Sequence, residues 1–144
     1  MMYNQRSAFL KSLIAPLFEA MGDFSLSQVK PELDKIFSQD CLVHMCFPFN
    51  DMQGYHEFYT NCLEKLSTAV PDLERRNLIV LAATTEHGNE WVSTMGNYVG
   101  TFQEQFLDIL PTGHLMHMRF HEFFKFEDRN ITEVQAIWDI PELM

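Results

Sequence analysis

The residues best suited to acid–base chemistry lie in the C-terminal segment HLMHMRFHEFFKFEDRNITEVQAIWDIPELM, residues 114–144. Asp139 stands between Trp138 and Ile140, and Glu122 stands among aromatic residues. A carboxyl group in apolar surroundings loses hydration, which disfavours its charged form. Such a group can take a proton from carbon and return it to oxygen. Asp139 is therefore the first candidate for a catalytic acid/base and Glu122 the second. The alternative is a carboxylate that caps a turn or contacts solvent.

Alternating residue types in this segment predict two antiparallel strands joined by a turn at Asp128 and Arg129, with Glu127 opposite Asn130. This register puts a mostly apolar set with a few polar groups on one inward face. The set comprises Met118, Phe120, Glu122, Phe124, Glu133, Gln135, Ile137 and Asp139. Such a face is typical of a pocket for a small apolar ligand. We expect Met118, Phe120, Gln135 and Ile137 to contact that ligand.

Several histidines are a second candidate set. His117 and His121 fall on the opposite face of the predicted strand, unless a bulge turns them inward. Two histidines without a neighbouring carboxylate make a poor metal site, so no metal is expected. His44 stands alone on an earlier predicted strand and is either a hydrogen-bonded core histidine or a ligand contact. These three histidines remain candidate binding residues.

Composition limits the class of protein. A formal net charge of −10 and the lack of a Lys/Arg cluster argue against a nucleic-acid partner. The three cysteines show no C-x-x-C spacing, which favours free thiols in a reducing compartment. No signal peptide and no apolar run of about 18 residues is evident. We therefore expect a cytoplasmic protein without a membrane partner.

Hydrophobic periodicity predicts one α+β domain over residues 1–144. Helices are expected over 7–21, with a kink or break at Pro16, then over 26–37 and 55–68. The expected strands are 41–47, 78–85 and 91–102, followed by the two C-terminal strands. Residues 103–113 are expected to form a loop long enough to cover a pocket mouth. A curved antiparallel sheet wrapped over the three helices would enclose a cone-shaped internal pocket.

The outer face of the sheet is predicted to be apolar. Its expected members are Leu115, Phe123, Val134, Ala136 and Trp138. One patch of this kind is too large to leave in water, whereas a two-fold axis would bury it against its own copy. We therefore expect a homodimer packed through this face.

The segment GTFQEQFLDILPTGHLMHMRFHEFFKFEDRNITEVQAIWDIPELM, with FPFNDMQG and PDLERRNLIVLAA before it, resembles the SnoaL-like proteins of the NTF2-like superfamily. The likeness covers most of the chain after about residue 25 and is most specific in PTG…RFHEFFKFED…ITEVQAIWD. The resemblance implies a cone-shaped α+β (cystatin-like) fold that is often a homodimer. It also implies ring closure by an intramolecular aldol step, without metal or organic cofactor. Asp139 matches the acid/base aspartate of the last strand.

Two departures from the family pattern concern Gln135, where Trp is frequent, and Arg129, where the hairpin often has Gly. The first changes the shape and polarity of the pocket, so the substrate does not carry over. The leading hypothesis is a cofactor-independent acid/base enzyme of aldol cyclase or isomerase type, acting on a small apolar carbonyl compound. Because this fold hosts many functions, the alternative is a non-catalytic domain that binds a small ligand.

Overall fold

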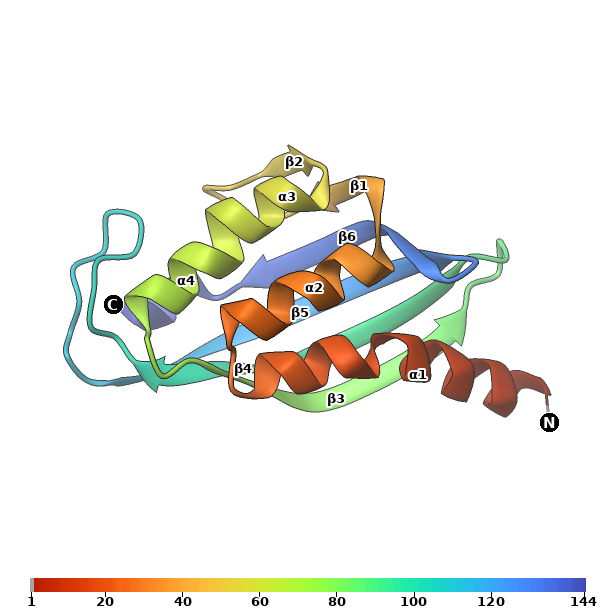
Figure 1. The fold of residues 1–144 in the computed structure, drawn as a ribbon, viewed down its shortest axis with the longest axis horizontal. Coiled ribbons are helices and arrows are strands. Elements are labelled where there is room, and N and C mark those ends of the chain that lie inside the picture. Colours follow the sequence, from red (N-terminus) through yellow and green to blue (C-terminus); the bar gives the residue numbers. More distant parts are fainter. Residues whose placement is uncertain (1) are drawn as a thin grey trace.

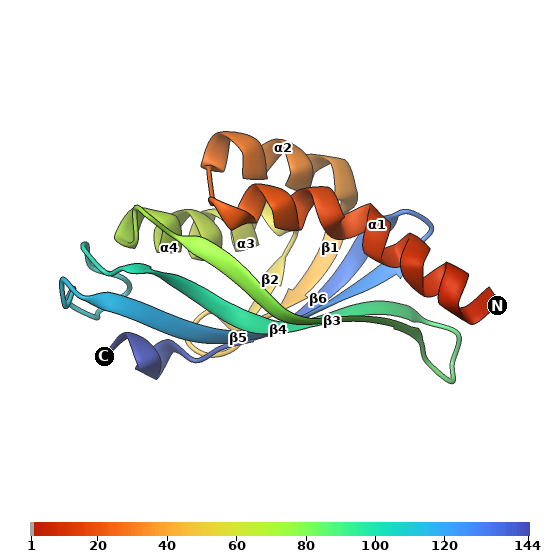
Figure 2. The ribbon, with the colours of Figure 1, turned by 90° about the horizontal axis from the view of Figure 1, so that it is seen from below.

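The structure, a computed structural model, describes residues 2–144, and the side chains of residues 5–144. Helices lie on the concave face of one curved sheet (Figures 1 and 2). The helical segments are α1 Met2–Gly22, α2 Leu26–Ile36, α3 Tyr55–Phe58, a π-helical turn Tyr59–Leu63, α4 Glu64–Ala69 and a C-terminal 3₁₀ turn Ile140–Leu143. The strands are β1 Phe37–His44, β2 Asp51–Gln53, β3 Glu74–Thr84, β4 Glu90–Thr101, β5 Leu115–Glu127 and β6 Asn130–Trp138. The predicted α+β arrangement of helices followed by a curved sheet is confirmed.

The six strands follow the order β2-β1-β6-β5-β4-β3, and the sheet does not close. Strands β3 to β6 are antiparallel neighbours, as predicted. However, β1 runs parallel to β6, so the prediction of a wholly antiparallel sheet is wrong. Strand β1 follows α2 directly and runs in the same direction as β6 (Figure 1). The short strand β2, which was not predicted, pairs with β1 at the edge of the sheet.

Helix α1 has the predicted apolar face, because Leu10, Ile14 and Leu17 are each at most 1% exposed. It nevertheless continues through Pro16 without a break. Pro16 and Ser12 are both exposed, so the Ser12 carbonyl that lacks a helical partner lies where water can hydrate it. Of the two predicted outcomes at Pro16, a kink or a break, the break does not occur.

The hairpin between β5 and β6 contains the feature that sets the inward face of the last strand. Glu127 pairs with Asn130 as predicted, but the register shifts between Phe126 and Lys125. Thr132 is the extra residue on β6, because Ile131 pairs with Phe126 and Glu133 with Lys125. A one-residue shift moves every later side chain of the strand to the other face.

The bulge reverses the predicted faces of β6. Gln135 and Ile137 point outward and are exposed, so their predicted inward placement is wrong. Val134, Ala136 and Trp138, which were expected outside, are instead 0%, 5% and 2% exposed. The inward positions of β5 are as predicted.

Candidate active site

Glu122 lies at the centre of a buried polar cluster on the concave face of the sheet. Its Oε1 accepts a 2.7 Å hydrogen bond from Arg75 Nη1, and its Oε2 accepts 2.7 Å and 2.8 Å bonds from Tyr98 Oη and Trp138 Nε1. Thr94 adds a bond from its hydroxyl to the Glu122 carbonyl oxygen at 2.8 Å. Both carboxylate oxygens are thus occupied by charged or polar donors.

Arg75 supplies the positive charge of this cluster. Its other donors reach Asn77 Oδ1 and Thr94 Oγ1, each at 3.0 Å, and its guanidinium carbon lies 4.0 Å from the Phe120 ring centroid. Desolvation by burial is the largest single effect on the pKa of Arg75 and lowers it, but the charges and hydrogen bonds of Glu122 and Tyr98 together outweigh it, so the pKa is raised from its usual value. Desolvation and the same carboxylate raise the pKa of Tyr98 well above its usual range. The cluster therefore consists of an ion pair with a neutral phenol.

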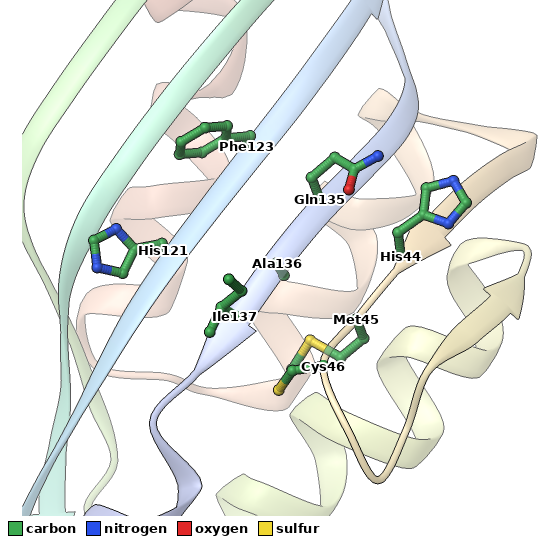
Figure 3. A pocket seen from close by; sticks show the side chains of 8 residues that line it. All are labelled: His44, Met45, Cys46, His121, Phe123, Gln135, Ala136 and Ile137. Atoms are coloured by element: carbon green, nitrogen blue, oxygen red, sulfur yellow. The ribbon is translucent and has the colours of Figure 1, made fainter.

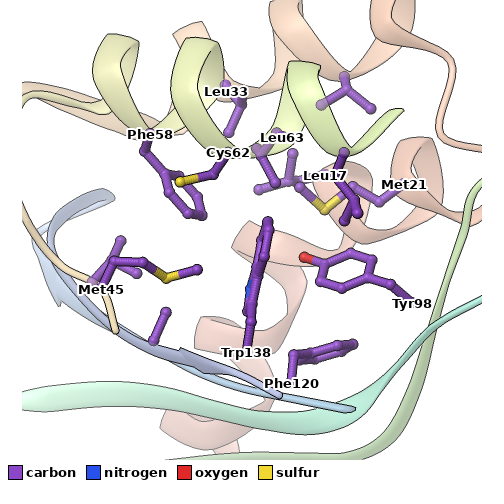
Figure 4. Close-up of a cluster of buried hydrophobic side chains, with 14 of the residues drawn as sticks. Leu17, Met21, Leu33, Met45, Phe58, Cys62, Leu63, Tyr98, Phe120 and Trp138 are labelled. Atoms are coloured by element: carbon purple, nitrogen blue, oxygen red, sulfur yellow. The ribbon is translucent and has the colours of Figure 1, made fainter. Parts of the chain in front are cut away.

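Side chains fill the space where the sequence predicts an internal pocket. Three aromatic side chains pack beneath the helices: Tyr98, Phe120 and Trp138 (Figure 4). The ring centroid of Tyr98 lies 5.2 Å from that of Trp138 and 4.8 Å from that of Phe120. Met118 and Phe120 are 0% exposed and Glu122 is 1% exposed. These residues point inward as predicted, but almost none of their surface is exposed to water. A ligand would reach them only after side chains moved.

Asp139 directly follows β6 and is exposed, so the predicted burial among apolar side chains is wrong. Its backbone N–H donates to the Arg119 carbonyl oxygen at 2.9 Å, and its own carbonyl accepts from the Glu142 N–H at 3.0 Å. Its side chain makes no cap on the 3₁₀ turn that follows. The carboxylate is therefore accessible, while the backbone that carries it is held in place.

His44 and His121 lie on the outer face of the sheet (Figure 3). His117 and His121 are exposed on β5, as the alternation predicts. His44 is not a core residue: its Nδ1 lies 2.9 Å from Asp51 Oδ1, in a cross-strand pair at the edge of the sheet. Together with Phe123, Gln135 and Ile137, His44 and His121 line a shallow hollow of about 370 Å³. The bulge thus leaves two groups of predicted binding residues on opposite sides of the sheet.

A larger groove opens at the end of the molecule where β6 stops. Three segments form its walls: the β1–β2 loop, the 102–114 loop and the C-terminal 3₁₀ turn. It encloses about 880 Å³ and is lined by Phe47, Pro48, Leu107, Asp108, Ile109, Leu110, Thr112, Ile140, Pro141 and Met144. We call it the rim groove. Asp139 immediately precedes two of its wall residues, Ile140 and Pro141.

Sequence reasoning missed Arg75 and Tyr98 as members of the polar cluster. The predicted strand began at Leu78, whereas β3 begins at Glu74 and places Arg75 directly opposite Tyr98 of β4. Plain alternation back from Val80 and Ala82 would have put Arg76 on the inward face, because only the register shift between Asn77 and Ile79 turns Arg75 inward.

Neither a metal cluster nor a membrane helix is found in the described chain. Within residues 2–144, no three His, Cys, Asp or Glu side chains come together as metal ligands. None of the helices in that range has the length and apolar character needed to cross a bilayer.

Sequence comparison gives the family. The model for SnoaL-like polyketide cyclases matches residues 15–144. The chain belongs to the SnoaL-like polyketide cyclase family. No curated protein matches the chain in sequence.

Solved structures confirm the fold expected of a SnoaL-like protein. AclR of Streptomyces galilaeus, a candidate hydroxylase, has a TM-score of 0.73 at 20% identity, covering 94% of this chain and 82% of its own. IdmH of Streptomyces antibioticus, a candidate polyketide cyclase, has a TM-score of 0.72 at 18% identity, covering 93% and 94%. A candidate SnoaL-like cyclase from Jannaschia sp. CCS1 reaches 0.76 at 16% identity, covering 94% and 88%. At these identities the likeness is one of fold.

Proposed function

We propose that this SnoaL-like protein is a cofactor-independent acid/base enzyme of the aldol cyclase type, acting on a small apolar carbonyl compound. The observation that carries the proposal is the position of Asp139. Asp139 is exposed at the end of β6 and directly precedes Ile140 and Pro141, which line the rim groove. The family match adds that the relatives are described as polyketide cyclases.

In the proposed reaction, a carboxylate oxygen of Asp139 removes a proton from the carbon next to a substrate carbonyl. The resulting enolate carbon attacks a second carbonyl of the same molecule and forms the new carbon–carbon bond. The alkoxide formed at that carbonyl takes the proton back from Asp139, so no oxidant or reductant is consumed. A bound apolar substrate displaces water from the carboxylate, which favours proton transfer to it.

Glu122 supports this proposal by positioning rather than by direct proton transfer. Its carboxylate accepts three hydrogen bonds, from Arg75, Tyr98 and Trp138, and the residue is only 1% exposed, so a substrate does not reach it. Trp138 is the residue before Asp139, and its indole is held by Glu122. The cluster therefore fixes the end of β6 from which the Asp139 side chain projects.

Replacement of Asp139 by Asn tests the acid/base assignment. Asn keeps the size of the side chain but cannot accept the proton, and general acid–base groups typically contribute roughly 10²–10⁴-fold to the rate. With a substrate found by screening aromatic ketones and polyketide-like esters, Asp139→Asn should lower kcat about a hundredfold or more. Asp40→Asn, on the exposed side of β1, is the matched control and should turn over normally. Equal turnover by the two variants would refute the role of Asp139.

A second candidate function is binding of a small ligand without catalysis. The fully engaged Glu122 favours it, because a saturated buried carboxylate stabilises the fold without doing chemistry. On this alternative, ligands bind to the chain with no turnover, and Asp139→Asn changes neither affinity nor stability.

A further inference from the structure

We propose that the rim groove is the ligand site of this protein and that it takes an uncharged, apolar compound with a hydrogen-bond donor at one edge. This ligand class would be the substrate class of the reaction proposed above. The catalytic role of the groove rests on that reaction. The binding itself is measured without turnover.

The most exposed apolar side chains gather at the rim groove. Met144, Phe47 and Leu110 are 83%, 81% and 72% exposed, more than any other large hydrophobic residue among the described side chains. All three line the rim groove, although they come from three segments far apart in the sequence. Clustered exposure of this kind marks a binding surface, because each side chain gains roughly 25 cal/mol per Å² when an apolar partner covers it.

The wall of the rim groove formed by the 102–114 loop is held in place by its own contacts. Phe106, 1% exposed, anchors the 102–114 loop, and its backbone exchanges 3.1 Å and 2.9 Å hydrogen bonds with Ile109. The loop ends are joined by bonds from the Phe102 N–H to the His114 carbonyl oxygen and from the Gly113 N–H to the Phe102 carbonyl oxygen. Binding to preformed walls avoids the entropy loss of ordering them.

Leu107 adds a local indication of function within that loop. Its φ is 57°, in the left-handed region that residues other than glycine seldom adopt. Its side chain lines the rim groove. Strained backbone of this kind persists where the surroundings hold it, and binding sites are a common place for it.

The charges in and around the rim groove indicate the class of ligand. Asp108 is the only ionisable side chain among the lining residues, Thr112 adds one hydroxyl, and no lining side chain is basic. The whole chain carries a formal charge of −10. An anionic ligand is therefore repelled both locally and at a distance, whereas an O–H or N–H group can donate to the Asp108 carboxylate. A volume of about 880 Å³ is within the range of small-molecule sites.

Two other parts of the described chain suit such a ligand less well. The concave interior around Trp138 and Phe120 is filled. The hollow around His121 is smaller, at about 370 Å³, and lies on the face we expect a second copy to cover.

Two fluorescent probes with one skeleton separate these requirements. N-phenyl-1-naphthylamine is uncharged, apolar and carries an N–H donor; 8-anilinonaphthalene-1-sulfonate adds a single negative charge to the same rings. We expect the neutral probe to bind the whole protein at least tenfold more tightly than the sulfonate. Equal affinity, or tighter binding of the sulfonate, would overturn the assigned ligand class.

Variants then locate the probe. Leu110→Gln and Met144→Gln, both exposed, should each weaken the neutral probe about tenfold, whereas Leu78→Gln on β3, 64% exposed and outside the groove, should change its affinity less than twofold. Asp108→Asn should tighten binding of the sulfonate and narrow the gap between the probes. If Leu110→Gln and Met144→Gln bind like the native chain, the ligand site is elsewhere.

Asp139→Asn separates this inference from the proposed function. If the rim groove is right and the reaction is wrong, the probe still binds in the groove while turnover does not depend on Asp139. If the reaction is right and the groove is wrong, Asp139→Asn abolishes turnover while Leu110→Gln leaves the KM and probe binding unchanged.

Discussion

Individual residues of the concave face show how one buried charge can organise an apolar interior. Glu122 is 1% exposed and Arg75 is 5% exposed, so each needs the other to offset the loss of hydration. Hydrogen bonds from Tyr98 and Trp138 complete the acceptor positions of Glu122. The cluster replaces the open pocket expected from the sequence with a satisfied polar network.

Glu122→Gln should strongly destabilise the protein. The amide removes the charge that compensates Arg75, and an uncompensated buried charge costs about 3–5 kcal/mol. Urea unfolding followed by tryptophan fluorescence should show this loss. Glu127→Gln, an exposed change of the same kind at the end of β5, should stay within about 0.5 kcal/mol of the native chain. A loss below about 1 kcal/mol for Glu122→Gln would mean that Arg75 is not dependent on this carboxylate.

At the scale of elements, local patterns predicted most of the helices and strands, and pairing details decided the rest. The buried face of α3–α4, with Phe58, Cys62 and Leu66, follows from three- and four-residue spacing. The parallel pairing of β1 with β6 does not, because it depends on contacts about ninety residues apart. The bulge at Thr132 does have a trace in the sequence, because the apolar positions change parity there, from Ile131 to Val134, Ala136 and Trp138.

The same bulge determines which residues of the candidate site were placed correctly from the sequence. The inward residues Met118, Phe120 and Glu122 precede any register change and were placed correctly. Those on β6 beyond Thr132 were reversed, and Asp139 with them moved from the expected interior to an exposed position. The rim groove was only partly foreseeable, because its three walls meet through the tertiary fold.

Gly96 on β4 lies where two elements approach most closely. It pairs with Asn77, beside the register shift of β3. A Cβ at this position would collide with the Arg76 carbonyl oxygen and lie 2.9 Å from Phe120 Cζ. The strand therefore needs glycine for lack of space rather than for its φ angle.

Gly96→Ala should destabilise the protein by roughly 1–3 kcal/mol or more, because the clash is with backbone that cannot rotate away. Gly22→Ala, at the end of α1 with no atom within 4 Å of the added Cβ, should be close to neutral. Thermal unfolding by circular dichroism compares the two variants. Similar midpoints for both would contradict the close approach of β3 to β4.

For the whole molecule, the outer face of the sheet determines how copies associate. The expected members Val134, Ala136 and Trp138 are buried inside, so that part of the predicted patch is wrong. The expected members Leu115 and Phe123 do lie exposed on the convex face, and further apolar side chains join them there. Together they are Leu42, Ile79, Leu81, Leu115, Phe123 and Ile137, which are 41–63% exposed. Pairing across β3 to β6 brings Ile79, His121 and Ile137 into one row and Leu81, Phe123 and Gln135 into the next.

We expect this face to form a homodimer, because a continuous apolar patch on a sheet is buried most simply against its own copy across a two-fold axis. Light scattering at micromolar concentration, neutral pH and moderate salt should give a dimeric mass. Ile137→Glu places a carboxylate near its symmetry mate and should yield monomers, whereas Leu110→Glu, also at an exposed position but in the rim groove, should remain dimeric. His117, Arg119 and His121 lie on β5 between Leu115 and Phe123, so polar side chains are interspersed with the apolar ones of this face. A monomeric mass for the native chain would refute the dimer and leave the convex face to another partner.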